Sequence, residues 1–94
     1  MEGARVEIEF CTQCGWTARA AWLAQELLTT FAGEIGELVL VPGTGGVLII
    51  RADGRTAWDR REDGFPEPVA VKQRVRDLID PDRDLGHADR GRGD

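Results

Sequence analysis

The two cysteines of the chain, Cys11 and Cys14, stand three positions apart as a C-x-x-C pair. Two thiols at this spacing can close a disulfide with each other, and the same spacing also occurs in metal sites. An alternating segment precedes the pair and a helical segment follows it, so the thiols are expected near a helix N-terminus, where backbone N–H groups favour the reactive thiolate. The residues predict reversible dithiol–disulfide chemistry; a metal site and a non-catalytic thiol pair are the alternatives.

The metal alternative lacks ligands within one chain. Tetrahedral metal sites usually take four protein ligands, whereas this sequence offers two cysteines and a single histidine, His87, far away near the C-terminus. A metal site would need ligands from two chains. We therefore expect neither a metal nor a bound cofactor.

The elements that position the cysteines follow from the spacing of apolar residues. Residues 5–10 alternate apolar and charged side chains, as in a strand with one buried face. From Ala18 to about Phe31, apolar residues recur every three or four positions, which predicts a helix. We expect Trp22 and Trp58 to be core residues or half-buried. The expected buried face of the helix consists of Ala20, Leu23, Ala24, Leu27, Leu28 and Phe31.

The second half of the chain contains three further strands and a helix. Two short apolar runs are typical of strands that are covered on both faces, and Asp53-Gly54 is a two-residue hairpin signal. A polar, turn-rich stretch follows, and Pro68 then marks a helix start. The expected order is therefore strand, helix, three strands, helix. The expected strands are 38–41, 47–52 and 55–59, the polar stretch is 60–67, and the helix is 68–79.

The loop at residues 42–46 leaves two pairings open. A right-handed crossover makes the first two strands parallel. The runs 38–41 and 47–50 can then form a hairpin, or the loop can pass over one intervening strand, a distance of about 10 Å. In the second case the loop crosses the C-terminal end of the first strand beside the cysteines, and residues 60–67 emerge at the same end.

Length and charge restrict the class of protein. The 94 residues suffice for one domain, expected over residues 1–80 and followed by a flexible charged tail over 81–94. A net charge of −5 argues against nucleic-acid and anionic-membrane partners. No apolar run reaches the about 18 residues that span a bilayer, and a signal peptide is not evident. We expect a cytoplasmic protein, in a reducing compartment where a C-x-x-C pair is more often redox-active than structural.

Three segments, taken in order, resemble the selenoprotein W-like family, also called the Rdx or SelT/SelW/SelH group. The resemblance covers roughly residues 4 to 80 and implies a thioredoxin-like α/β (α+β) fold, β-α-β-β-β-α, for the domain at 1–80. The implied mixed four-stranded sheet has the order second, first, third, fourth strand, which selects the crossing loop. It also implies a redox protein linked to glutathione or thioredoxin as electron donor. The segments are Phe10-Cys11-Thr12-Gln13-Cys14-Gly15-Trp16, Thr44-Gly45-Gly46-Val47 and Glu62-Asp63-Gly64-Phe65.

Cys11 and Cys14 are the candidate catalytic residues. One thiolate would attack a sulfur of a partner, and the other thiol would resolve the mixed disulfide. Thioredoxin geometry favours Cys11 as the attacking residue, because the cysteine nearer the helix start is expected to be more exposed. Alignment with the family favours Cys14, where members commonly carry selenocysteine. With no basic side chain inside the motif, thiolate stabilisation is expected mainly from the helix terminus, with Arg19 as a secondary contributor.

Four further residues are candidates for docking a partner. The backbone amides and carbonyls of Gly45 and Gly46 are expected to pair with an extended partner segment, with plain turn geometry as the alternative. Trp16 and Phe65 are expected to flank the same site as apolar surface, with core packing as the alternative. Asp63 is either a proton acceptor near the thiols or, more ordinarily, a turn residue.

Two functions remain open from the sequence. The first is a thiol–disulfide oxidoreductase that acts on thiol or disulfide protein partners or on glutathione disulfides. The alternative is a redox-sensitive protein-interaction module without fast turnover. The sequence names neither the substrate nor the direction of electron flow, because a reduction potential depends on thiolate stabilisation that spacing does not report.

Overall fold

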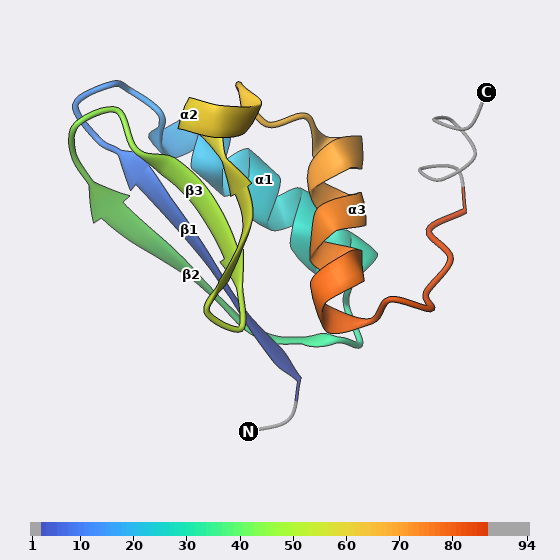
Figure 1. Ribbon diagram of the computed structural model, residues 1–94. Coiled ribbons are helices and arrows are strands. Elements are labelled where there is room, and N and C mark those ends of the chain that lie inside the picture. Colours follow the sequence, from blue (N-terminus) through green and yellow to red (C-terminus); the bar gives the residue numbers. More distant parts are fainter. Residues whose placement is uncertain (1–2, 87–94) are drawn as a thin grey trace.

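A four-stranded sheet with two long helices on one of its faces forms the protein, as the computed structural model shows for residues 3–86 (Figure 1). The strands and long helices lie within a few residues of the expected ranges, and a short helix is present in the stretch expected to be irregular. The elements are β1 (Ala4–Cys11), α1 (Thr17–Thr30), β2 (Ile35–Gly43), β3 (Leu48–Ala52), β4 (Arg55–Asp59), α2 (Arg60–Asp63) and α3 (Pro68–Ile79).

The strand order is β2-β1-β3-β4, which confirms the mixed sheet implied by the family resemblance. β1 is parallel to β2 and antiparallel to β3, and β3 is antiparallel to β4. At the end of β1, Cys11 pairs with Gly43 of β2 while Phe10 pairs with Leu48 of β3. The connection from β2 to β3 therefore passes over the end of β1, and the hairpin pairing of these two strands is wrong.

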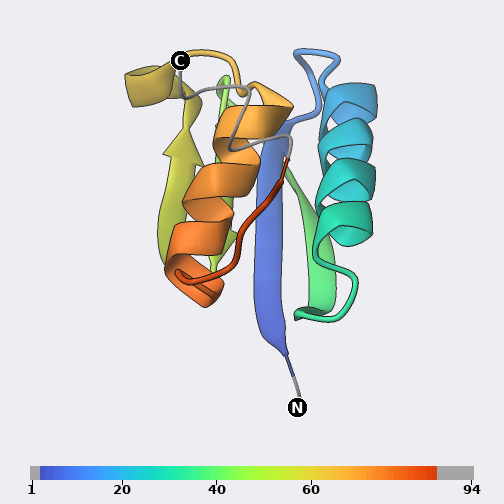
Figure 2. The same ribbon diagram turned by 90° about the vertical axis from the view of Figure 1, so that its right-hand side faces the viewer.

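One hydrophobic core lies between the sheet and the helices α1 and α3 (Figure 2). Val6, Ile8 and Phe10 of β1 point into it, whereas Glu7 and Glu9 lie on the opposite face of the strand. This is the alternation expected for a strand with one covered face. The buried cluster contains Val6, Ile8, Phe10, Leu48, Ile50, Ala57 and Trp58 from the strands, Ala20, Leu23, Ala24, Leu27, Val71 and Val75 from the helices, and Phe31.

The other face of the sheet carries charged side chains. Arg5 pairs with Glu37 at 3.0 Å, and Arg51 pairs with Glu9 at 3.1 Å. The expectation that β2 and β3 are covered on both faces is wrong, because α1 and α3 lie on the same side of the sheet. β2 is moreover an edge strand, in which Leu40 is exposed.

Two apolar residues of α1 are exposed against expectation. Trp22 is 49% exposed and Leu28 is 44% exposed, whereas Trp58 of β4 is 6% exposed, as expected. Successive helical residues are about 100° apart around the axis, so Leu28 lies at the edge of the face that carries Leu23 and Leu27, and Trp22 lies on the side away from it. The apolar residues of α1 are thus spread over a larger part of the helix circumference than the part that is buried.

The described part of the C-terminal segment contacts the domain. Arg83 donates to the carbonyl of Thr30 at 2.9 Å and forms an ion pair with Glu34, and Leu85 packs against the core. The division into a domain at 1–80 and a flexible tail at 81–94 stays a prediction, and most of that tail, with His87, lies outside the described residues. Within residues 3–86, no helix is long and apolar enough to cross a membrane.

Candidate functional site

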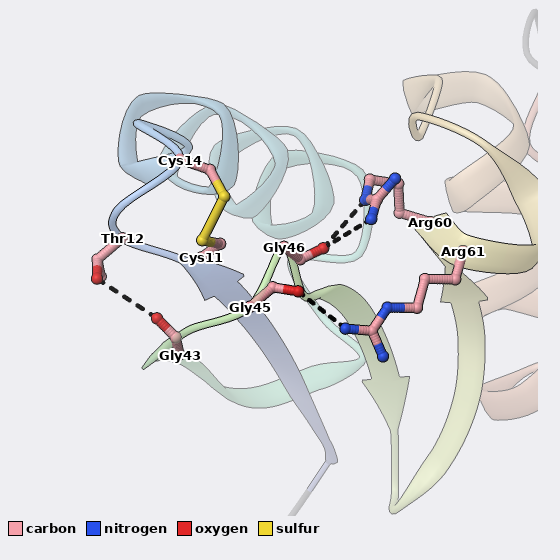
Figure 3. The surroundings of a disulfide bond; sticks show 8 residues. All are labelled: Cys11, Thr12, Cys14, Gly43, Gly45, Gly46, Arg60 and Arg61. Carbon is pink, nitrogen blue, oxygen red and sulfur yellow. Dashed lines mark hydrogen bonds between the residues drawn. A yellow bond between two sulfur atoms is a disulfide. The ribbon is translucent and has the colours of Figure 1, made fainter.

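Cys11 and Cys14 form a disulfide at the end of β1, with their Cα atoms 5.3 Å apart (Figure 3). Cys11 is the last residue of β1, and Cys14 lies in the turn that leads to α1. The turn closes on itself, since the N–H of Gly15 donates to the carbonyl of Thr12 at 3.1 Å. Gly15 has a φ of +77°, a conformation that glycine adopts without strain. The turn thus brings the second sulfur back to the strand end.

The two cysteines differ in their exposure to solvent. Cys11 is only 1% exposed, whereas Cys14 is exposed. The expectation that Cys11 is the more accessible residue is wrong, because Cys11 is still part of the sheet. It pairs with Gly43 of β2, and its N–H donates to the carbonyl of Val47 at 2.8 Å on the β3 side. An incoming partner therefore meets Cys14 first.

The N-terminus of α1 lies directly after the disulfide. Trp16 occupies the N-cap position, makes no side-chain capping hydrogen bond within the described structure, and accepts a bond from the N–H of Ala20 at 2.9 Å. The first turn of α1 contains no acidic residue. The helix terminus therefore presents N–H groups without an opposing carboxylate of its own, an arrangement that favours negative charge on a nearby sulfur.

The glycine loop, residues 43–46, lies against the disulfide (Figure 3). The carbonyl of Gly43 accepts from the N–H of Thr12 at 3.2 Å, which fixes the start of the loop to the C-x-x-C turn. Gly45 and Gly46 have φ values of +72° and +77°. Positive φ at two consecutive residues explains why the loop has glycine at both positions.

Two arginines donate hydrogen bonds to carbonyl groups of this loop. Arg61 donates through Nη2 to the carbonyl of Gly45 at 2.9 Å, and Arg60 donates through Nε and Nη2 to the carbonyl of Gly46 at 3.1 and 2.9 Å. The carbonyl groups that were expected to bind a partner segment thus already accept intramolecular bonds.

Sequence reasoning missed Arg60 and Arg61, which are the first residues of α2. The available signal was Asp59 followed three residues later by Glu62, which matches the capping-box pattern of a helix start. In the structure the side chain of Asp59 accepts from the N–H of Arg61 at 3.0 Å. The cap therefore fixes the helix turn that carries both arginines.

Trp16 and Phe65 do lie together beside the disulfide turn. Their rings meet edge to face, with 5.3 Å between the centroids. The guanidinium of Arg19 lies 4.6 Å from the ring centroid of Phe65, and that of Arg60 lies 5.2 Å from the ring centroid of Trp16. Trp16 is half-buried against the core, whereas Phe65 is 49% exposed. The site thus has an aromatic border with cations above the rings, a favourable arrangement.

The contacts of Asp63 are with residues that fix the local fold. Its carboxylate accepts from the N–H of Asp59 at 3.0 Å and pairs with Arg74 at 2.9 Å. The hydrogen bond from the Asp59 backbone, and then the bond and charge of Arg74, lower the pKa of Asp63 below its usual range. These contacts favour the turn interpretation over a role as proton acceptor. Residues 3–86 contain no group of three or more histidine, cysteine, aspartate or glutamate side chains arranged to hold a metal ion.

Comparisons with known proteins agree with this geometry. The Rdx family model matches residues 5–77. The crystal structure of a Bordetella parapertussis protein has 56% sequence identity and a TM-score of 0.80, and the match covers 83% of this chain and 100% of that one. A selenoprotein W-related protein from Vibrio cholerae has 52% identity and a TM-score of 0.79, with 84% and 100% covered. No curated protein matches the chain significantly.

Proposed function

Because the chain belongs to the Rdx family, we propose that it is a thiol–disulfide redox protein that uses Cys11 and Cys14 and acts on protein or glutathione disulfides. The observation that carries this proposal is the disulfide at the end of β1, in which one cysteine is buried and the other is exposed. An exposed sulfur can react with a partner, and a buried sulfur beside it can react only within the protein. This is the division of roles that dithiol exchange requires.

In the reduced protein, Cys14 is the attacking residue. Its thiolate attacks one sulfur of a partner disulfide, the partner's S–S bond breaks, and the partner's second sulfur leaves as a thiolate that takes up a proton. The thiolate of Cys11 then attacks the sulfur of Cys14, which releases the partner as a thiol and forms the Cys11–Cys14 disulfide. Two electrons pass to the partner, and a thiol donor such as glutathione or thioredoxin returns them.

The partner would bind at the aromatic border of the site. Phe65 and Trp16 offer apolar surface next to Cys14, and the N–H groups of Gly45 and Gly46 offer donors for an extended partner segment. The contacts that support this assignment are the edge-to-face pair at 5.3 Å and the exposure of Phe65.

The test compares single-cysteine variants in the reduction of insulin and of a glutathione mixed disulfide. Cys14→Ser should abolish activity, because the exposed nucleophile is lost. Cys11→Ser should accumulate a mixed disulfide through Cys14, detectable by mass spectrometry of the intact protein, because the resolving thiol is lost. Wild-type rates no higher than those of Cys14→Ser would disprove the oxidoreductase function.

A redox-sensitive interaction module is the second candidate function. Trp16 follows the disulfide turn directly and touches Phe65, so opening the disulfide can change the exposed aromatic surface without any turnover. Affinity capture with oxidised and with reduced protein should then recover different partners. Identical sets from the two forms would contradict this candidate.

A further inference from the structure

Arg60 contacts Trp16, which bonds the backbone of Cys11, and Gly46, which directly precedes the other residue that does so. Its Nε and Nη2 donate to the carbonyl of Gly46, and its guanidinium lies 5.2 Å from the ring centroid of Trp16. Val47, which follows Gly46, accepts from the N–H of Cys11 at 2.8 Å, and Trp16 donates its N–H to the carbonyl of Cys11 at 3.4 Å. Arg60 therefore restrains both the Gly46–Val47 segment and Trp16, between which the backbone of Cys11 is held.

The contact with Gly46 also determines the direction of a peptide dipole. The peptide bond between Gly46 and Val47 is trans, so its C=O and its N–H point to opposite sides. Arg60 of α2 holds the C=O, so the N–H of Val47 points away from that guanidinium, and the carbonyl of Val47 bonds the N–H of Cys11. Figure 3 shows Gly46 between Cys11 and the guanidinium of Arg60.

Arg60 is itself held in place by the surrounding residues. Asp59 caps α2 through the N–H of Arg61, and Asp63 ties the end of α2 to Arg74 of α3 at 2.9 Å. The guanidinium also fits closely against the loop, since a Cβ atom on Gly46 would lie 3.4 Å from Nη2 of Arg60. A half-buried arginine with fixed backbone, carbonyl and ring contacts is suited to positioning its neighbours.

We propose that Arg60 is a positioning residue for the sulfur chemistry, which stabilises negative charge on Cys11 by directing the Gly46–Val47 peptide and by placing a guanidinium behind it. The inference rests on the proposed function, in which Cys11 becomes a thiolate whenever Cys14 is joined to a partner. When a partner thiolate attacks the sulfur of Cys14, the Cys11–Cys14 bond breaks and its electron pair moves to Cys11. N–H dipoles and cations near that sulfur favour the charged product.

The test measures the titration of Cys11 alone, in a Cys14→Ser background, by the ultraviolet absorbance of the thiolate as pH is raised. Adding Arg60→Gln should raise the pKa of Cys11 by about half to one unit, which lowers the thiolate fraction about threefold to tenfold at pH values below the pKa. If Arg60 has a purely structural role, the titration curve of Cys11 should be unchanged.

Arg61→Gln is the matched control. It removes the same charge from the same helix and a bond to the neighbouring carbonyl of Gly45, but that carbonyl belongs to the peptide one residue further from Val47. Its effect on the titration should be less than half that of Arg60→Gln. Equal shifts of the Cys11 pKa in the two variants would show that the net charge of α2 matters and the position of Arg60 does not, and would overturn the proposal.

An unchanged Cys11 titration in folded Arg60→Gln, with folding checked by circular dichroism, would also overturn it. If Arg60→Gln does not fold, Arg60→Lys replaces it, because lysine keeps the charge but cannot donate from two nitrogens to one carbonyl. The pKa of Cys11 should then rise by less than in Arg60→Gln. An unchanged titration curve would overturn the positioning role. The titration involves no partner. Failure of wild-type turnover therefore refutes only the proposed function, and failure of the titration shift refutes only the role of Arg60.

Discussion

Cys11 and Cys14 are chemically identical residues with different environments. The spacing of the pair indicated correctly that the two cysteines can form a disulfide, but not which of them is exposed. Access depends on the position of β2 and β3 on either side of Cys11, and the residues there that pair with it, Gly43 and Val47, lie more than thirty positions further along the chain. Local sequence carries no signal for such a contact, which is why exposure was assigned to the wrong cysteine.

Gly43 illustrates how tightly the residues around Cys11 pack. A Cβ atom at Gly43 would lie 2.8 Å from Cγ1 of Val47 and 3.1 Å from a carboxylate oxygen of Glu9. Gly43→Ala should therefore lower the free energy of unfolding by about 1–3 kcal/mol, the usual cost of overpacking. Gly33→Ala is the control, because no atom lies within 4 Å of its Cβ position. Urea denaturation curves with equal midpoints for the two variants would contradict the prediction.

Trp58 is buried and Trp22 is exposed, so substitutions at these two tryptophans can be compared. The indole N–H of Trp58 donates to the carbonyl of Gly64 at 2.9 Å, in a side chain that is almost fully buried. Trp58→Phe should lower the free energy of unfolding by about 1–2 kcal/mol, because the carbonyl of Gly64 loses its partner. Trp22→Phe, on the exposed side of α1, should change it by less than about 0.5 kcal/mol. Thermal unfolding of both variants measures the difference.

At the scale of elements, periodic segments were predictable and α2 was not. The alternation along β1 and the three-and-four spacing along α1 and α3 each repeat over several residues, so their signals are strong. α2 has four residues and no period, and contacts with β4 and α3 fix it. Because α2 carries Arg60 and Arg61, the part of the site that it contributes was absent from the sequence prediction.

The stability of the region around α2 should depend on pH through Asp63. Its carboxylate is charged and bonded in the folded protein, which lowers its pKa below the ordinary 3.8. The stabilisation is thus fully present above the ordinary pKa and is lost as the pH falls through the lower pKa of the folded state. In acid titrations followed by circular dichroism, Asp63→Asn should lose stability less steeply than wild type below about pH 4.

The asparagine variant is a conservative test of that charge. Its amide oxygen can still accept from the N–H of Asp59, so the fold of α2 is expected to persist while the charge interaction with Arg74 is lost. Arg74→Gln removes the other partner and should reduce the acid dependence in the same direction. Parallel acid unfolding curves for wild type and both variants would show that Asp63 does not contribute in this range.

At the scale of the molecule, four separate segments meet at one end of the sheet: the end of β1, the glycine loop, the start of α1 and α2 (Figure 1). Hydrophobic patterns alone left the pairing of β2 open between a hairpin and a crossing loop. The resemblance to a family with a known strand order was needed to choose correctly. The expectation that β2 and β3 are covered on both faces was wrong, because a continuous apolar run does not report how many layers lie around it.

The fold should survive reduction of its disulfide. The bond closes a loop with only two residues between the cysteines, so the chain-entropy estimate of its contribution is about 2 kcal/mol. For a domain of this size, that corresponds to a fall in Tm of about 10 °C. Thermal melts with and without reductant, compared with a Cys11→Ser, Cys14→Ser double variant, measure the effect. A reduced protein that is unfolded at room temperature would contradict the prediction.

The position of Cys11 on an inner strand has a consequence for how the two sulfurs can separate. β1 is hydrogen-bonded to β2 and β3 along its length, so its amide hydrogens should exchange with solvent only when the whole domain unfolds. Cys14 lies in a surface turn, whose amides can exchange through local opening. Breaking the S–S bond should therefore let Cys14 move while Cys11 keeps its place, and each cycle of the proposed redox reaction would return the mobile sulfur to a fixed one.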